Sequence, residues 1–360
     1  MQPVLSIKNL VMRYLTAGGD VKALNGVSLE IEPEEVVGIV GESGSGKTTL
    51  GLSITKLIPS PPAVYPGGRV DYKGIDLLQI PKGMMRYIRG TEVSMIFQEP
   101  LTSLNPVMSI GSQLAEAIRV RESRVSSTSD PETFRLAIQS GQVEKLNESS
   151  GAAGQSKEAI VEEGIQALKL VRITDPERVY LRYPHELSGG MRQRVMIAMA
   201  LSQKPSLLIA DEPTSALDVT TQAEILKLIK DLIHEVRTSV LFITHDLATV
   251  GHITDRVAVM YAGEIIEEAP TRELLSNPRH PYTQGLIASF PSGYKRSPAI
   301  HPIPGMVPDL RNLPSGCKFH PRCPFAFEPC AERVPAWTTM AEKAEHGVAC
   351  HLYGGEGKLA

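Results

Sequence analysis

The order of apolar and polar residues in the first part of the chain predicts short strands separated by turns. Apolar and polar positions alternate at Leu5–Ile7 and Val27–Ile31, as in strands with one buried face. Val36–Val40 is continuously apolar and bounded by turn residues, which is typical of a parallel strand buried on both faces. This pattern predicts an α/β protein.

Later segments extend the same pattern. Three apolar runs end in polar residues and predict strands, at Val93–Gln98, Ser206–Glu212 and Val240–His245. The segment Thr221–Val236 has apolar residues at helical spacing, so we expect an amphipathic helix with one core face. The apolar positions are Ile225, Leu228, Ile229, Leu232, Ile233 and Val236.

Two segments have a different texture. Residues from about 121 to 157 are rich in Ser, Gly and Asn, which predicts a surface insertion that is partly disordered. Beyond about Pro291 the sequence turns to Pro, Cys and short polar pieces, so we expect a small appended domain.

Composition narrows the class of protein. The 360 residues are 42% hydrophobic and 21% charged, with a net charge of −3, which is ordinary for a globular protein. This charge gives no indication of nucleic-acid binding. Apolar runs are far shorter than the roughly 18 residues of a membrane span, and the N-terminus does not have the pattern of a secretory signal. We therefore expect a cytosolic chain that contacts a membrane only through partners.

The segment Gly41–Thr48 matches the phosphate-binding pattern G-x-x-x-x-G-K-[ST]. The buried strand before it and the helix-compatible run Thr49–Leu57 after it disfavour the alternative of a chance glycine-rich turn. Backbone N–H groups at the helix start can bind phosphate oxygens. Lys47 can supply a charge to the β- and γ-phosphates, and the Thr48 hydroxyl can ligate magnesium. The residues expected at ATP in this loop are Gly41, Ser43, Gly44, Ser45, Gly46, Lys47, Thr48 and Thr49.

Two strands end in groups suited to phosphate hydrolysis. Asp211 can hold the magnesium shell, and Glu212 can act as the general base that polarises the attacking water. His245 would contact the γ-phosphate and hold the water in place. The alternative for the two acids is a loop pair that caps the next helix, and the alternative for His245 is a helix-capping or surface histidine.

The run Leu187–Met191 reads LSGGM and precedes a helix expected from Met191 to about Leu201. Ser188, Gly189 and Gly190 place a hydroxyl and two bare amides at a helix start, which is a second anion site.

The P-loop, the LSGG run and the acidic pair together resemble the ATP-binding cassette (ABC) family. The resemblance covers about residues 4–270 and implies a RecA-like core with an antiparallel β subdomain and a helical subdomain at about 99–190. It implies that each ATP lies between the P-loop of one subunit and the LSGG of another. Met191 departs from the glutamine that is most frequent at its position.

The same resemblance assigns further residues. It implies that Tyr14 stacks on adenine, although an ordinary sheet tyrosine is the alternative. Gln98 is implied to ligate magnesium and to begin the segment Glu99–Pro106, which would contact a membrane subunit. The loop Ser215–Asp218 lies where the family has a contact between ATPase subunits.

The region after the cassette narrows the subfamily. His280–Leu286, Met191–Ala200 and the cysteine-bearing end are similar to the D-type ATPase of oligopeptide and dipeptide importers. We therefore expect a nucleotide-binding domain at 1–270 and a transporter C-terminal domain at 271–360. The implied partners are a paralogous second ATPase, two membrane permease subunits and, indirectly, an extracytoplasmic solute-binding protein. The resemblance implies that the protein works at the cytoplasmic face of the membrane. It implies oligopeptides or dipeptides as cargo, with oligosaccharides as the alternative.

Four cysteines lie in the tail, at Cys317, Cys323, Cys330 and Cys350. Their spacing lacks the C-x-x-C typical of zinc sites, and a cytosolic setting disfavours disulfides. The importer resemblance implies a 4Fe–4S cluster; zinc and no metal stay open as alternatives.

Two other functions are weighed. A soluble ABC ATPase of DNA repair or translation would carry long coiled coils or a second cassette, and neither is seen. A non-catalytic subunit would lack Glu212 or His245, and both are present.

Overall fold

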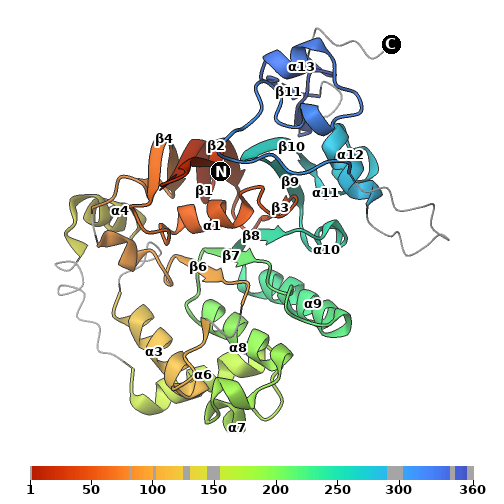
Figure 1. Cartoon of the computed structure of the whole chain (residues 1–360). Coiled ribbons are helices and arrows are strands. Elements are labelled where there is room, and N and C mark those ends of the chain that lie inside the picture. Colours follow the sequence, from red (N-terminus) through yellow and green to blue (C-terminus); the bar gives the residue numbers. More distant parts are fainter. Residues whose placement is uncertain are drawn as a thin grey trace. The chain divides into compact units, whose positions relative to one another are not determined.

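A computed structural model describes residues 2–81, 83–99, 103–124, 130–143, 155–289, 303–340 and 345–354 (Figure 1). The chain forms two compact units. Unit 1 contains residues 1–5, 31–35 and 70–241, and unit 2 contains residues 6–30, 36–69 and 242–360.

Unit 1 is built around two parallel strands and a group of helices. Strands β6 (Val93–Ile96) and β7 (Leu207–Asp211) pair in register from Val93 opposite Leu207 to Ile96 opposite Ala210. All five residues of β7 are buried, as its apolar run predicted. The short strand β5 (Ile75–Asp76) pairs with the end of β4 (Ala63–Tyr72).

The helices of unit 1 gather mainly into one bundle, visible in the lower part of Figure 1. Helix α3 contacts α6, α7 and α8. The contact depends on small residues, since a Cβ at Gly111 would overlap the ring of Tyr180, and one at Gly164 would lie 2.7 Å from it. The helices of unit 1 are η1 (Met84–Tyr87), α3 (Ile110–Glu122), α4 (Pro131–Ser140), α6 (Lys157–Leu170), α7 (Pro176–Tyr180), η2 (Pro184–Glu186), α8 (Gly189–Ser202) and α9 (Val219–Val236).

The insertion contains a helix that the sequence analysis did not predict. Residues 131–140 form α4, and partial disorder in the rest of the insertion stays a prediction. The side chains of Phe134, Ile138 and the following Val143 are fully buried. Burial of these three apolar side chains stabilises α4. The Ser- and Gly-rich composition of the surrounding segment gave no indication of this helix. Residues 125–129 and 144–154 lie outside the described part.

Unit 2 contains the strand that leads into the phosphate-binding loop. Strand β3 (Val36–Val40) pairs in parallel with β9 (Arg256–Tyr261), and β9 pairs antiparallel with β10 (Glu264–Pro270). Strand β12 (Gly347–Ala349) from the tail pairs with β10, and β11 (Trp337–Thr339) pairs with β12. Most of β1 (Leu5–Thr16), β2 (Gly19–Ile31) and the first part of β4 form a second sheet, in the order β2-β1-β4. Strand β8 (Ser239–Thr244) begins in unit 1 and ends in unit 2.

The core of unit 2 joins cassette and tail residues. Val40, Val259 and Tyr261 pack in one cluster with Tyr282 and Phe319. The helices are α1 (Lys47–Ile54), α10 (Leu247–Ile253), α11 (Thr271–Ser276), α12 (Pro281–Ala288), η3 (His320–Arg322) and α13 (Glu328–Glu332). In the ranges that the structure describes, no helix combines the length and apolar character needed to cross a membrane.

Candidate nucleotide-binding site

The phosphate-binding loop joins β3 to α1. Gly46 is the N-cap of α1 and has φ 105°, a left-handed conformation that favours glycine. A Cβ at Gly46 would also lie 2.7 Å from the carbonyl oxygen of Ala23. The predicted strand–loop–helix arrangement is therefore confirmed, with a helix that starts two residues earlier than expected.

Two side chains of this loop, Ser45 and Lys47, are buried and carry polar groups that can bind an anion. The Lys47 ammonium is buried and donates to the carbonyl oxygens of Gly41 at 2.8 Å and Glu42 at 3.0 Å. The Ser45 hydroxyl is buried without a hydrogen-bond partner in the described residues. Buried polar groups are normally satisfied, so this hydroxyl suits a bound phosphate oxygen. Ser43, Gly44 and Thr48 are exposed, and Thr49 is half-buried.

Two further predicted residues lie in the same unit. Tyr14 is half-buried in β1 and lies near Tyr65, whose phenol pKa is raised chiefly by burial and slightly by Tyr14. His245 is exposed and directly follows β8. The next residue, Asp246, caps α10 by accepting from the N–H of Ala248 at 2.9 Å. The roles of Tyr14 and His245 toward ATP stay predictions.

In unit 1, the structure brings Gln98 and Glu212 together. Asp211 is the buried last residue of β7, and Glu212 follows with φ 45°. A non-glycine residue in this left-handed region is uncommon and costs backbone energy, which is often found at functional sites. The Nε2 of Gln98, just after β6, donates to Oε2 of Glu212 at 3.1 Å.

The LSGG segment forms a capped helix start. Ser188 is exposed and is the N-cap of α8, and its Oγ accepts from the N–H of Met191 at 3.3 Å. The helix begins at Gly189 rather than at Met191 as expected. A Cβ at Gly190 would lie 2.7 Å from the methyl group of Thr221 on α9, so glycine there permits close contact of the two helices.

The four cysteines line one small cavity in unit 2, together with residues that include His280, Phe319 and Leu352. All four are free thiols. Burial, mainly, raises the pKa of Cys317 to about 11 and of Cys350 to about 12, with smaller contributions from the other thiols. In the described part of the chain, no group of three or more His, Cys, Asp or Glu side chains is arranged to hold a metal ion.

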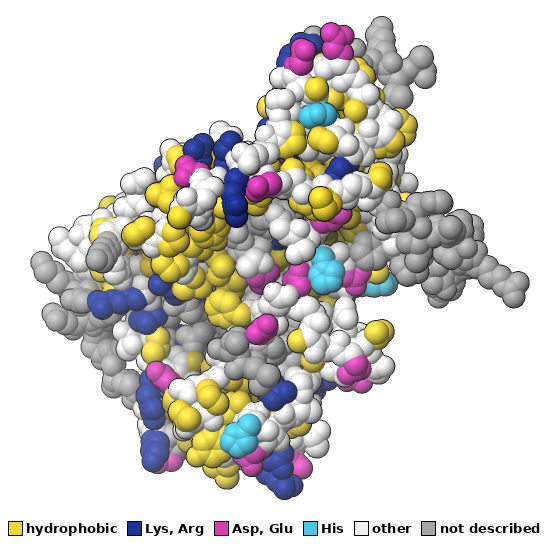
Figure 2. Space-filling view, in the orientation of Figure 1, with side chains coloured by type: hydrophobic (Ala, Val, Ile, Leu, Met, Phe, Trp, Pro, Cys, Tyr) yellow, Lys and Arg dark blue, Asp and Glu magenta, His cyan; other side chains and the backbone are white. Residues whose placement is uncertain are grey.

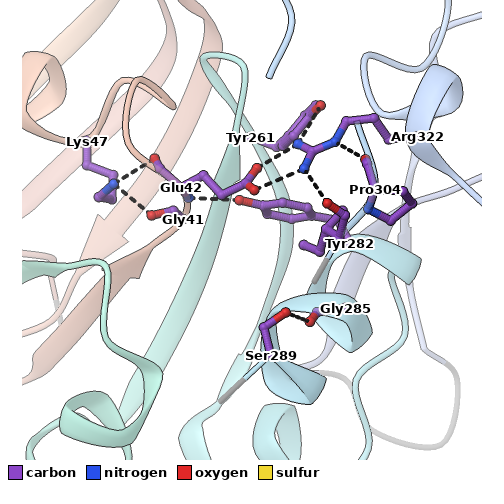
Figure 3. A network of polar contacts seen from close by, with 10 residues as sticks. Gly41, Glu42, Lys47, Tyr261, Tyr282, Gly285, Ser289, Pro304 and Arg322 are labelled. Carbon is purple, nitrogen blue, oxygen red and sulfur yellow. Dashed lines mark hydrogen bonds and ion pairs between the residues drawn. The ribbon is translucent and has the colours of Figure 1, made fainter. Parts of the chain in front are cut away.

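One set of contacts was missed by the sequence analysis. Arg322 in the tail forms two hydrogen bonds to the Glu42 carboxylate, and the Tyr282 hydroxyl accepts from the Glu42 N–H at 2.8 Å (Figure 3). Glu42 occupies a variable position of the P-loop pattern, and 280 residues separate it from Arg322. No local spacing signals such a pairing.

Comparison with known proteins adds the family. Residues 24–215 match the model described as ABC transporter, and residues 266–330 match the oligopeptide/dipeptide transporter C-terminal region. The chain is 44% identical to the oligopeptide transport ATP-binding protein OppD of Bacillus subtilis, over 92% of this chain and 84% of that protein. It is 41% identical to the dipeptide transport ATP-binding protein DppD of the same organism, over 98% and 95% of the two chains.

A solved structure supports the fold. The dimeric ATP-binding cassette MJ0796, in a post-hydrolysis state with ADP and phosphate, matches with a TM-score of 0.59 and 26% identity. The match covers 74% of this chain and 99% of that one. By these similarities and by its P-loop and the LSGG segment at the start of α8, the chain belongs to the ABC transporter family of ATP-binding subunits and is an ATPase with the oligopeptide/dipeptide transporter C-terminal region.

Proposed function

We propose that this ATPase powers peptide import, working at the cytoplasmic face of a membrane with two permease subunits. The names of the relatives and the matched C-terminal region support peptide cargo. An extracytoplasmic binding protein would deliver the cargo. Oligosaccharides are the alternative cargo, and uptake of labelled peptides and oligosaccharides by vesicles that contain the assembled transporter distinguishes the two.

The contact between Gln98 and Glu212 carries the catalytic part of this proposal. Glu212 acts as general base toward water, and Gln98 holds its carboxylate. Asp211, Gln98 and Thr48 offer the oxygen ligands that Mg²⁺ prefers, while Lys47 supplies positive charge to the phosphates. His245 orients the attacking water, and Tyr14 stacks on adenine.

Replacing Glu212 by Gln tests this assignment. The amide oxygen can still accept the hydrogen bond from Gln98, but the base is lost. We expect ATP binding to persist and hydrolysis to fall at least ~100-fold. ATP turnover is measured by phosphate release, and Glu224→Gln on α9 serves as the control. Turnover close to that of the unmodified chain would contradict the role of Glu212.

A second cassette completes the site in this proposal, because Ser188 and the start of α8 form an anion site that can serve a partner's ATP. A paralogue is the expected partner. With ATP bound and hydrolysis blocked by Glu212→Gln, the chain and its partner should form a dimer in size-exclusion chromatography. Ser188→Arg should abolish that dimer, and an unchanged dimer would argue against the shared site.

A groove in unit 1 supports contact with a permease. It has a volume of about 760 Å³. Val107 and Leu181 in its wall are 79% and 75% exposed, and Tyr183 adds an aromatic face. Figure 2 shows hydrophobic side chains gathered with a histidine and basic residues over α7. An exposed apolar patch with a polar rim marks a site of protein contact, and this one adjoins the segment expected to touch the membrane subunit.

The groove is tested by copurification of permease subunits. Leu181→Asp should lose them while nucleotide binding is retained, because a carboxylate would be desolvated in the interface. Val334→Asp, at an exposed apolar residue of the tail, is the matched control. Retention of the permease by Leu181→Asp would exclude this surface.

We also propose that the four cysteines hold a 4Fe–4S cluster, with zinc and no metal as the alternatives. Their convergence on one cavity supports this, and so does His280. Its Nδ1 accepts from the N–H of Tyr282, which leaves a proton on Nε2, and Nε2 is buried without a partner among the described residues. Such a donor suits a cluster sulfur, and thiolate ligands are typical of these clusters.

Anaerobic purification tests the cluster. We expect a brown protein with broad visible charge-transfer absorption, and iron and sulfide in equal amounts. Cys323→Ser should bleach the colour. Colourless protein containing zinc would overturn the cluster in favour of the alternative.

A further inference from the structure

The tail makes a partly buried ion pair with the phosphate-binding loop. Arg322 donates from Nη1 and Nη2 to the two carboxylate oxygens of Glu42, at 2.7 and 3.0 Å (Figure 3). The side chain of Arg322 is 5% exposed and that of Glu42 is 28% exposed. Such bidentate pairs combine strong electrostatics with fixed geometry.

Arg322 is itself held in one position. Its Nε donates to the carbonyl oxygen of Pro304 at 2.9 Å, and its guanidinium lies 5.9 Å from the ring centres of Tyr261 and Phe319. The ring of Tyr282 packs against both aromatic residues, with centroid distances of 4.6 and 5.3 Å. Packing beside these aromatic rings therefore fixes the orientation of the guanidinium toward Glu42.

The pair reaches the phosphate-binding groups through the Glu42 backbone. The Glu42 N–H donates to the hydroxyl of Tyr282, and the Glu42 carbonyl accepts from the ammonium of Lys47. Any shift of Glu42 would move the peptide on which Lys47 rests. A second effect is electrostatic, because an unpaired carboxylate in this loop would repel a triphosphate.

We propose that Arg322 is a positioning residue for nucleotide binding: by neutralising and anchoring Glu42, it makes the ATP affinity of the P-loop depend on the tail. This rests on the proposed ATP site. Cys323, which lines the cysteine cavity, directly follows Arg322.

Nucleotide affinity of the full-length chain tests the proposal, measured with Mg²⁺ and a non-hydrolysable ATP analogue by calorimetry. Arg322→Ala should weaken binding about tenfold, since loss of one partner leaves a charge unpaired. Arg311→Ala, which removes an exposed arginine of the tail, should leave affinity unchanged.

A rescue experiment separates this role from a structural one. Adding Glu42→Gln to Arg322→Ala removes the uncompensated carboxylate, while the backbone at position 42 keeps its hydrogen bonds to Tyr282 and Lys47. Affinity should therefore recover to within about threefold of the unmodified chain, and the remaining loss measures the anchoring by Arg322. A merely structural arginine predicts no recovery. Unchanged affinity in Arg322→Ala, or no recovery in the double variant, would overturn the proposal.

Two further variants keep the test decisive. If Arg322→Ala does not fold, the pair Glu42→Gln/Arg322→Met removes both charges at similar volume, and near-normal affinity then supports neutralisation, whereas a tenfold loss contradicts it. Lys47→Ala tests the ATP site itself. If Lys47→Ala binds normally, the proposed function fails; if only Arg322→Ala binds normally, this inference alone fails.

Discussion

Glu264 should make the stability of unit 2 depend on pH in an unusual direction. This carboxyl lies at the start of β10 and is largely buried, which raises its pKa from 4.5 to about 7, while Lys318 opposes the rise. Between these two pH values the unfolded chain has released the proton and the folded chain still holds it. The folded state therefore binds more protons, and the free energy of unfolding falls as pH rises.

The size of the effect follows from the pKa difference. Each pKa unit corresponds to roughly 1.4 kcal/mol, so the loss between pH 4.5 and pH 8 is about 3 kcal/mol. Glu264→Gln has no proton to release and should escape this loss. It should match the unmodified chain near pH 4.5 and exceed its stability by about 3 kcal/mol at pH 8.

Urea unfolding at a series of pH values measures this. Trp337 is the single tryptophan of the chain and lies in the tail of unit 2, so its fluorescence reports the relevant unit. Glu332→Gln, at an exposed carboxyl of the same tail, controls for the change in net charge. If Glu264→Gln and the unmodified chain lose stability in parallel between pH 5 and pH 8, the reasoning from burial is wrong.

Two other substitutions probe features that the sequence concealed. Phe134→Ala should destabilise unit 1 by about 3–5 kcal/mol, because it leaves an unfilled cavity. Leu136→Ala, at an exposed residue of α4, should cost less than about 1 kcal/mol. Equal effects of the two substitutions in chemical denaturation would argue against a packed α4. Glu267→Ala should cost about 3 kcal/mol, because its buried carboxylate accepts from the N–H groups of Arg279 and His280 and contacts His346; an unchanged urea midpoint would refute this.

Local patterns predicted the parts of the site that are contiguous in sequence. The apolar run Val36–Val40 and the glycines and lysine after it specify strand, loop and helix together, because each step uses neighbouring residues. The acidic pair at the end of β7 was predicted in the same way, because it directly follows the apolar run of that strand. Several helix and strand ends differed from expectation by one or two residues, as at Gly189, where Ser188 caps the helix directly. Strands β1 and β2 are much longer than the alternating runs that predicted them.

Long-range relations were not predictable in the same way. The approach of Gln98 to Glu212 follows from the parallel pairing of β6 with β7, and only the family resemblance placed both residues at one site. The ion pair between Glu42 and Arg322 depends on how the tail packs, and neither residue has a local signature. In the insertion, helix α4 was not predicted, because it has only two buried apolar residues within a segment of mainly polar composition.

The position of β12 bears on how this protein can be shortened. This strand covers the open side of β10 through pairs such as Val348 with Glu267, and Trp337 of β11 lies against Gly347. Removing the last residues would leave the backbone N–H and C=O groups of β10 bare. Bare strand edges recruit strands from other molecules, so a trimmed chain should self-associate into aggregates. Strand β12 thus keeps the edge of β10 paired and closed to such contacts.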